Sequence, residues 1–199
     1  MQKPFSQACE NNKAPILAVL QRIFTDPVTV WEIASGTGQH AVHFAGGLPQ
    51  VIWQPTDLAP NLSGMSLWFD EAGVDNILPP LTLDVRDDPW PCDGLEAVFT
   101  ANSLHIMSWE EVETFFTRLG RYLLPGALSC SYGPYNVGGE YTSESNARFD
   151  VWLKTQNPLS AIRDLDALGR LADAAGIDLL EDNAMPANNK LLIWRKRKS

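Results

Sequence analysis

A buried strand that turns through a glycine-rich loop into a helix lies near the N-terminus of this chain. The apolar run 28–34 meets Ser35-Gly36-Thr37-Gly38, and residues 39–45 continue with a helical pattern. Glycines let the backbone of such a loop approach a ligand closely, and the amide groups at a helix N-terminus attract an anionic group. The stretch therefore predicts an α/β domain with a ligand site beyond the carboxyl end of its first strand.

Strands and helices alternate along the rest of the chain, as apolar runs and apolar stripes at helical spacing indicate. We expect strands over residues 28–34, 51–56, 81–84, 97–101, 127–132, 177–181 and 190–194, and helices over 12–24, 39–45, 62–72, 109–123, around 149–153 and over 165–175. Because the last two strands have no helix between them, the final strand should run antiparallel. The sequence thus predicts one domain, residues 1–199, with a seven-stranded, mainly parallel sheet covered by helices on both faces.

The composition disfavours several function classes. The 199 residues carry a formal net charge of −9, which does not attract nucleic acid or anionic lipid. No apolar stretch approaches the ~20 residues that cross a bilayer, and the polar N-terminal residues lack the apolar segment of a signal peptide. We therefore expect a cytoplasmic protein, in which the basic run 195–199 is a solvated tail.

The metal-binding residue types are also scattered. Cys9, Cys92 and Cys130 have no zinc-ligand spacing, and an odd number of cysteines is no disulfide framework. His40 and His43 lack a third ligand nearby in the sequence. No metal site is expected.

Two nucleotide-type cofactors fit the glycine loop. Gly36-x-Gly38-x-x-Ala41 matches a dinucleotide-binding pattern, and Asp57 follows Gly38 by 19 residues, where an acidic residue would bind a ribose. NAD is therefore one candidate. Glu32 favours the other, S-adenosylmethionine, because a carboxylate would repel the pyrophosphate of a dinucleotide but can bind a cationic amine or sulfonium. The loop amides and the helix N-terminus can then receive the carboxylate of S-adenosylmethionine.

The run 30–38, VWEIASGTG, resembles motif I of the class I S-adenosylmethionine-dependent methyltransferases, with Ala34 in place of the first glycine of that motif. Asp57 closes the second strand, where the family binds the ribose hydroxyls, and Asp84-Val85 closes the third, where the family contacts the adenine amine. The turn 124–127, LPGA, and the terminal hairpin are also similar, so the resemblance covers residues 12–195. It implies a Rossmann-like class I methyltransferase fold and S-adenosylmethionine as the cofactor, bound by Glu32, Ala34, Gly36, Gly38, His40, Asp57, Leu58, Asp84, Val85 and Asn102.

Four longer runs resemble one group within that superfamily. They are residues 4–6, 12–17, 142–150 and 185–189. On these runs the chain resembles the DUF938 group, which is similar to methyltransferase-like protein 26. The resemblance supplies no methyl acceptor, because the group is defined by sequence rather than by reaction. It implies that the N-terminal segment 1–25 closes over the cofactor, as such segments often do in this fold.

Candidate acceptor residues follow the later strands. His105 lies in the segment 100–105, which resembles a segment of small-molecule methyltransferases, and is a candidate general base; alternatively it packs against the cofactor or caps the next helix. The segment 133–158 is rich in hydrogen-bonding groups, so it is either a substrate lid or a solvated loop with a helix cap at Ser143. The residues expected to contact the substrate are Tyr135, Asn136, Asn146, Arg148 and Asn188.

These observations favour an enzyme that transfers a methyl group from S-adenosyl-L-methionine to a small molecule. Two alternatives stay open: a noncatalytic module that binds this cofactor, and an NAD-dependent oxidoreductase. The net charge of −9 and the lack of the [D/N]-P-P-[Y/F] signature of base-amine methylation disfavour a nucleic-acid acceptor, whereas a protein acceptor stays open. The sequence indicates neither the acceptor atom nor the oligomeric state.

Overall fold

A computed structural model of the chain describes residues 2–198. The chain divides into two compact units, which are described separately. Unit 1 consists of Met1–Pro91 and Leu95–Thr100, and unit 2 consists of Cys92–Gly94 and Ala101–Ser199. The expectation of a single domain stays a prediction.

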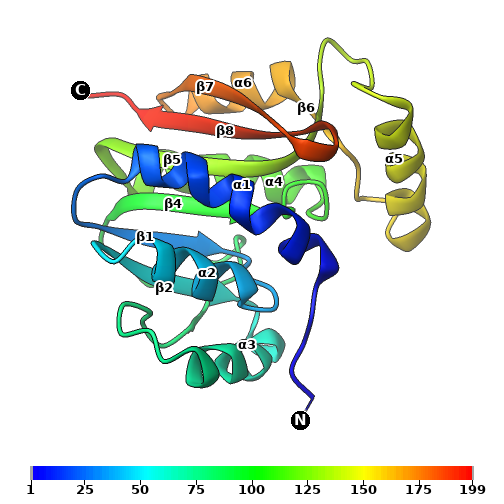
Figure 1. The fold of residues 1–199 in the computed structure, drawn as a ribbon. Coiled ribbons are helices and arrows are strands. Elements are labelled where there is room, and N and C mark those ends of the chain that lie inside the picture. Colours follow the sequence, from blue (N-terminus) through cyan, green and yellow to red (C-terminus); the bar gives the residue numbers. More distant parts are fainter. Residues whose placement is uncertain (1, 199) are drawn as a thin grey trace. The chain divides into compact units, whose positions relative to one another are not determined.

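Unit 1 is a parallel sheet with three helices beside it (Figure 1). Its elements are α1 (Gln7–Ile23), β1 (Val28–Ile33), α2 (Gln39–Gly47), β2 (Val51–Asp57), α3 (Ala59–Ala72), β3 (Leu81–Thr82) and β4 (Leu95–Ala101), the last residue of which belongs to unit 2. The strands lie in the order β3-β2-β1-β4 and all pairs are parallel. Ile33 pairs with Thr56, so β1 and β2 end side by side and the turns that follow them lie together.

The core of unit 1 is aromatic. Phe44 of α2 lies 5.5 Å from Trp53 of β2 and 5.2 Å from Phe99 of β4, measured between ring centroids. All three side chains are fully buried. Tilted and edge-on contacts between such rings stabilise a core beyond the area that they bury. This cluster fixes α2, and with it the glycine loop, against the sheet.

Unit 2 combines an antiparallel sheet with helices. Its elements are α4 (Trp109–Tyr122), β5 (Leu123–Asn136), α5 (Glu144–Gln156), β6 (Arg163–Asp164), α6 (Leu165–Ala174), β7 (Ile177–Met185), the 3-10 turn η1 (Pro186–Asn188) and β8 (Asn189–Lys196). The strands lie in the order β5-β8-β7, with both neighbouring pairs antiparallel, and β6 pairs with β5 in parallel. Figure 1 shows the β7–β8 hairpin in red and orange and α5 in yellow.

The predicted fold class is confirmed: the chain is a mixed α/β protein, mostly parallel, with antiparallel C-terminal strands. Side chains cap the starts of α4, α5 and α6. Ser108 and Glu111 form a reciprocal capping box at α4, and Asp164 accepts two backbone amides at the start of α6. Ser143 caps α5 by accepting the amide of Asn146, so this part of the 133–158 segment is a helix start.

Several predicted boundaries are wrong. Helix α1 begins at Gln7 and not near residue 12, because the Ser6 side chain caps it by accepting the amide of Cys9. Strand β5 covers 14 residues rather than the predicted 127–132; beyond residue 132 it pairs with β8 as far as Pro134 and with the short strand β6 at Tyr135 and Asn136. Arg195 and Lys196 lie in β8, and the Lys196 ammonium donates to the carbonyls of Gly120 and Ala175. Much of the basic run is thus part of the fold.

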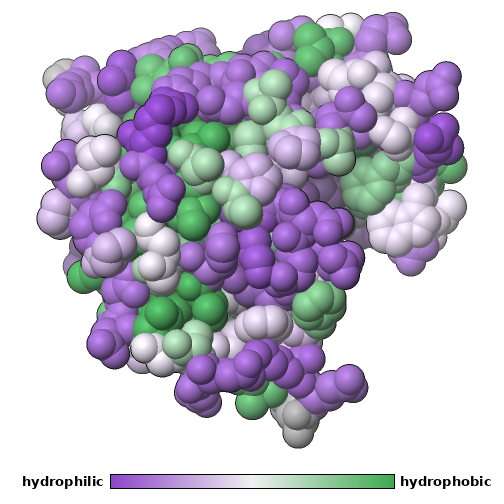
Figure 2. Space-filling model, in the orientation of Figure 1, coloured by the Kyte–Doolittle hydropathy of each residue, from purple (hydrophilic) through white to green (hydrophobic). Residues whose placement is uncertain are grey.

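The face seen in Figure 2 is largely hydrophilic, with scattered apolar residues and a paler area over α5. Val151 and Trp152 of this helix are exposed, while Leu153 is buried. Of these three side chains, only Leu153 packs inside the protein. Over residues 2–198, no helix has both the length and the apolar character that crossing a membrane requires.

Candidate functional site

Three residues of the loop after β1 have a left-handed backbone. Ala34, Gly36 and Gly38 have φ angles of 61°, 58° and 85°. Glycine adopts this conformation without steric cost, whereas an alanine pays for the contact of its Cβ with the backbone. Gly38 has a second reason to be glycine, because a Cβ there would lie 2.8 Å from the Cβ of Met65 in α3. Gly36 and Gly38 are thus glycines of the motif at positions where the backbone conformation itself favours glycine.

A Gly38→Ala variant should be less stable than a Gly36→Ala variant. Both substitutions introduce a Cβ at a positive φ, which costs about 1–2 kcal/mol. Only the Cβ at position 38 also collides with Met65, since nothing lies within 4 Å of a Cβ at position 36. Overpacking of this kind adds about 1–3 kcal/mol. Urea unfolding of both variants measures the difference, and equal loss of stability would contradict the packing explanation.

Glu32 is a buried carboxyl group at the end of β1, with 2% of its surface exposed. The indole Nε1 of Trp53 donates a hydrogen bond of 2.8 Å to its Oε2. Burial raises the pKa of Glu32 to about 7, and the nearby Asp57 acts in the same direction, while hydrogen bonds from Trp53 and Ser35 lower it. An ionised carboxylate in this position is costly without a cation beside it. A positively charged ligand would supply that compensation.

Asp57, at the end of β2, holds the glycine loop. Its Oδ2 accepts the amide of Gly36 at 2.6 Å, and its Oδ1 accepts the amide of Leu58 and the side-chain amide of Asn61, both at 2.7 Å. Asp57 is buried, whereas the side chain of Leu58, the N-terminal cap residue of α3, is 46% exposed. The two predicted cofactor residues Asp57 and Gly36 are therefore in direct contact within unit 1.

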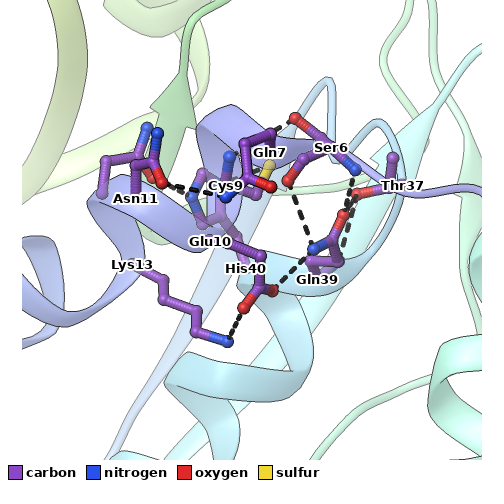
Figure 3. A network of polar contacts seen from close by, with 10 residues as sticks. Ser6, Gln7, Cys9, Glu10, Asn11, Lys13, Thr37, Gln39 and His40 are labelled. Atoms are coloured by element: carbon purple, nitrogen blue, oxygen red, sulfur yellow. Dashed lines mark hydrogen bonds and ion pairs between the residues drawn. The ribbon is translucent and has the colours of Figure 1, made fainter.

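The start of α1 is tied to the start of α2 by a polar network (Figure 3). Gln39 accepts the amide of Ser6 at 2.6 Å through its side-chain oxygen and donates to the carboxylate of Glu10 at 2.7 Å. Glu10 in turn forms an ion pair with Lys13. The N-terminal segment predicted to close over the cofactor is thus fastened to the helix that follows the glycine loop.

His40 faces α1 and the aromatic core. Its Nε2 lies 2.6 Å from the side-chain oxygen of Asn12, and its ring stacks on Phe44. Burial lowers the pKa of His40 to about 4, so the ring is neutral at physiological pH. His40 therefore packs between α1 and the aromatic core. Its expected contact with a cofactor stays a prediction.

Asp84 and Val85 lie in the turn after β3. Asp84 binds the guanidinium of Arg86, whose hydrogen bonds lower the pKa of the Asp84 carboxyl. Val85 is buried and its carbonyl accepts the indole N–H of Trp90. The structure thus gives Asp84 a local partner, and its expected adenine contact stays a prediction.

In unit 2, Asn102 and His105 lie between β4 and α4. Asn102 has a φ of 55°, and its amide donates to the carbonyl of Tyr132. His105 is 5% exposed and meets Phe149 edge-on, with 5.3 Å between ring centroids. Burial, and secondarily the charge of Arg163, lower the pKa of His105 to about 4. The ring is therefore neutral near pH 7 and has a lone pair available.

The residues predicted to contact a substrate also belong to unit 2. Asn146 and Asn188 lie together, because the side-chain amide of Asn146 donates to the carbonyl of Asn188 at 3.2 Å. Arg148 is exposed and 3.7 Å from Glu144. Tyr135 and Asn136 end β5, and the Tyr135 hydroxyl and the Asn136 Oδ1 are buried without a hydrogen-bond partner among the described residues. Their roles toward a substrate stay predictions.

The structure therefore brings Glu32, Gly36, Gly38 and Asp57 into one cluster within unit 1. Sequence reasoning missed Trp53, Gln39 and Arg163, because a tryptophan in a strand, a glutamine in a helix and an arginine in a short strand look like ordinary structural residues. Among residues 2–198, no three His, Cys, Asp or Glu side chains are grouped so that they could bind a metal ion.

The chain matches one protein family and is similar to several solved structures. The family described as "Protein of unknown function (DUF938)" matches residues 3–196, and the chain belongs to this family. Among solved structures, an O-methyltransferase family protein from Burkholderia thailandensis is similar with a TM-score of 0.82 and 15% identity, over 94% of this chain and 57% of that one.

Two further structures are similar. The S-adenosylmethionine-dependent methyltransferase SibL in its apo form has a TM-score of 0.80 and 21% identity, over 96% of this chain and 56% of that one. Human N-acetylserotonin methyltransferase, in complex with S-adenosylmethionine, has a TM-score of 0.75 and 14% identity, over 96% of this chain and 58% of that one. The chain spans a little more than half the length of these three proteins. At these identities the likeness establishes a Rossmann-like methyltransferase fold.

Proposed function

We propose that the chain is an S-adenosylmethionine-dependent methyltransferase that acts on a small molecule. The observation that carries the proposal is the buried carboxyl of Glu32 beside a left-handed glycine loop that Asp57 holds in place. A buried acid at this position favours a cationic ligand, and the fold is one that methyltransferases share. The same acid would repel the pyrophosphate of NAD.

The polar groups of unit 1 fit S-adenosylmethionine by their chemistry. Glu32 and Asp57 are acceptors for its cationic groups and its ribose hydroxyls. Helix α2 begins at Gly38 with no side-chain cap and no acidic residue in its first turn, so its amides suit a carboxylate. When bound, the cofactor supplies a methyl group on a positively charged sulfur.

The residues of unit 2 support the acceptor half of the proposal. His105 is neutral near pH 7 and its ring nitrogens form no hydrogen bond with residues 2–198, so a ring nitrogen can accept a hydrogen bond from the hydroxyl or amine of an acceptor. Tyr135, Asn136, Asn146, Arg148 and Asn188 are the proposed substrate contacts. The net charge of −9 favours a small-molecule acceptor over nucleic acid, and a protein acceptor is the second candidate.

The proposal is tested by turnover. Incubated with methyl-labelled S-adenosylmethionine and pooled small hydroxyl and amine acceptors, the chain should form S-adenosylhomocysteine and a labelled product. A His105→Gln variant should turn over about 100-fold more slowly with unchanged affinity for S-adenosylhomocysteine, because it loses a general base. A His43→Gln variant is the matched control.

Other outcomes identify the alternatives. Cofactor binding without turnover on small molecules or on a protein pool would favour the noncatalytic module. Binding of NADH in place of S-adenosylhomocysteine would favour the oxidoreductase. Full activity of His105→Gln would show that His105 is not a general base. The contribution of unit 2 would then be to orient the acceptor.

A further inference from the structure

Every carbonyl of the turn that carries His105 is bound by one segment of unit 2. The carbonyls of residues 104–107 accept, in order, from Arg163 Nε at 2.9 Å, from the Ala161 amide at 3.1 Å, from Ser160 Oγ at 2.7 Å and from Arg163 Nη2. Two of the four hydrogen bonds come from one guanidinium group. Of the two side chains that donate to these carbonyls, Ser160 binds one and Arg163 binds two, so Arg163 contributes most to the conformation of residues 104–107.

Arg163 is an unusual residue for such a position. It is 7% exposed, and its hydrogen bonds go to the carbonyls of Leu104, Met107 and Leu159. Its guanidinium also lies over the Trp109 ring, and the charges of Asp150 and Glu111 act on it without forming an ion pair. A buried cation that no carboxylate contacts directly costs desolvation energy, and an apolar side chain of similar size is often at least as stabilising. The rigid fork of the guanidinium can, however, bind several carbonyls in a fixed geometry, which lysine cannot. Stability alone gives little reason for this arginine.

The same segment also fixes the surroundings of the His105 ring. The amide of Ile162 donates to Asp150 Oδ1 at 2.7 Å, which ties the segment to α5. Phe149 of that helix meets the ring edge-on. On another side, a Cβ on Gly133 would lie 3.6 Å from Nδ1 of His105. Both the backbone and the ring of His105 are thus held by groups connected to residues 160–163.

We propose that Arg163 is the positioning residue of His105: its guanidinium holds residues 104–107 in one conformation and thereby orients the His105 ring. This inference rests on the proposed function for its meaning, since His105 is the proposed base. Arg163 itself touches no substrate in this account and acts only through the turn.

The test uses readouts that need neither cofactor nor acceptor. The amides of Ile106 and Met107 both donate to the carbonyl of Ser103, so their hydrogen exchange reports on the turn. In Arg163→Met and Arg163→Lys variants, exchange at these two amides should be at least about tenfold faster than in the wild type. The pKa of His105, followed by NMR, should also rise in Arg163→Met, because the charge of Arg163, which adds to the effect of burial in lowering it, is removed.

The matched control is Arg197→Met, which removes a partly exposed arginine of the same unit that pairs with Asp173 and Asp178. It should change neither readout. If Arg163→Met does not fold, hydrogen exchange in Arg163→Lys tests the inference, because lysine keeps the positive charge but lacks the planar guanidinium group that binds two carbonyls.

Two results would overturn the inference. One is exchange at Ile106 and Met107 within about twofold of the wild type in the folded variant. The other is equal acceleration of all amides of unit 2, which would make Arg163 a general stabilising residue. Because neither readout involves methyl transfer, a positive result together with no turnover would refute the proposed function alone.

Discussion

A Glu32→Gln variant is expected to be more stable than the wild-type chain at about pH 8 and equally stable at about pH 4. The folded-state pKa of Glu32, about 7, lies above its ordinary value of 4.5. Between these values the folded chain binds a proton that the unfolded chain has released, so stability falls as pH rises from 4.5 to 7 and stays lower above 7. A pKa difference of one pH unit between the folded and unfolded chain corresponds to about 1.4 kcal/mol, so the difference between 4.5 and about 7 gives an upper bound of about 3.5 kcal/mol. Gln avoids this cost and can still accept from Trp53.

The same substitution should abolish cofactor binding. It therefore raises stability and lowers cofactor affinity, so the two effects of Glu32 can be measured separately. In the wild type, cofactor affinity should fall as pH drops below about 7, because a cationic ligand must then displace the proton on Glu32. Urea unfolding at the two pH values and calorimetric titration measure the two effects. Glu96→Gln is the control, since Glu96 is an exposed strand carboxylate that accepts the amide of Thr29. A Glu32→Gln variant that is less stable at high pH would contradict the buried-charge account.

An Asp57→Ala variant should lose affinity for S-adenosylhomocysteine by about 100-fold or more, since hydrogen bonds to charged groups are each worth about 1.5–3 kcal/mol. Asp57 holds the amides of Gly36 and Leu58, so its loss releases the glycine loop as well as the proposed ribose contact. Stability should also fall by about 1–3 kcal/mol, because buried donors lose their acceptor.

Two variants make the Asp57 result interpretable. Asp57→Asn retains one acceptor oxygen and should be intermediate in affinity. Asp75→Ala removes an exposed acid from the same unit and should change nothing. Calorimetry gives the affinities and urea unfolding the stabilities. Unchanged affinity in folded Asp57→Ala would mean that this residue serves the loop only.

Much of the fold could be predicted because its signals are local. Alternating apolar runs and stripes indicated the mixed sheet, and the absence of a helix between the last two strands indicated the antiparallel hairpin. The caps at Ser108 and Asp164 follow from side chains that bind amides two or three residues away. The start of α1 was missed because its first turn is polar and only the cap at Ser6 marks it.

The candidate site was predictable only in part, for a related reason. Glu32 stands out in an apolar strand, and the glycines of its loop have a known spacing. The partners of these residues come from distant positions: Trp53 lies on the neighbouring strand, and Gln39 depends on contacts with α1. Arg163 is 58 positions from His105, and no periodicity relates it to the turn that it binds.

The most direct test of the central claim is calorimetric titration of the wild-type chain with S-adenosylhomocysteine, with NADH as a second ligand. The account predicts micromolar binding of S-adenosylhomocysteine, which corresponds to about −8 kcal/mol, and no heat with NADH, whose pyrophosphate the Glu32 carboxylate would repel. Binding of NADH without binding of S-adenosylhomocysteine would contradict it, because the buried Glu32 would then tolerate a pyrophosphate and would not serve a cationic ligand.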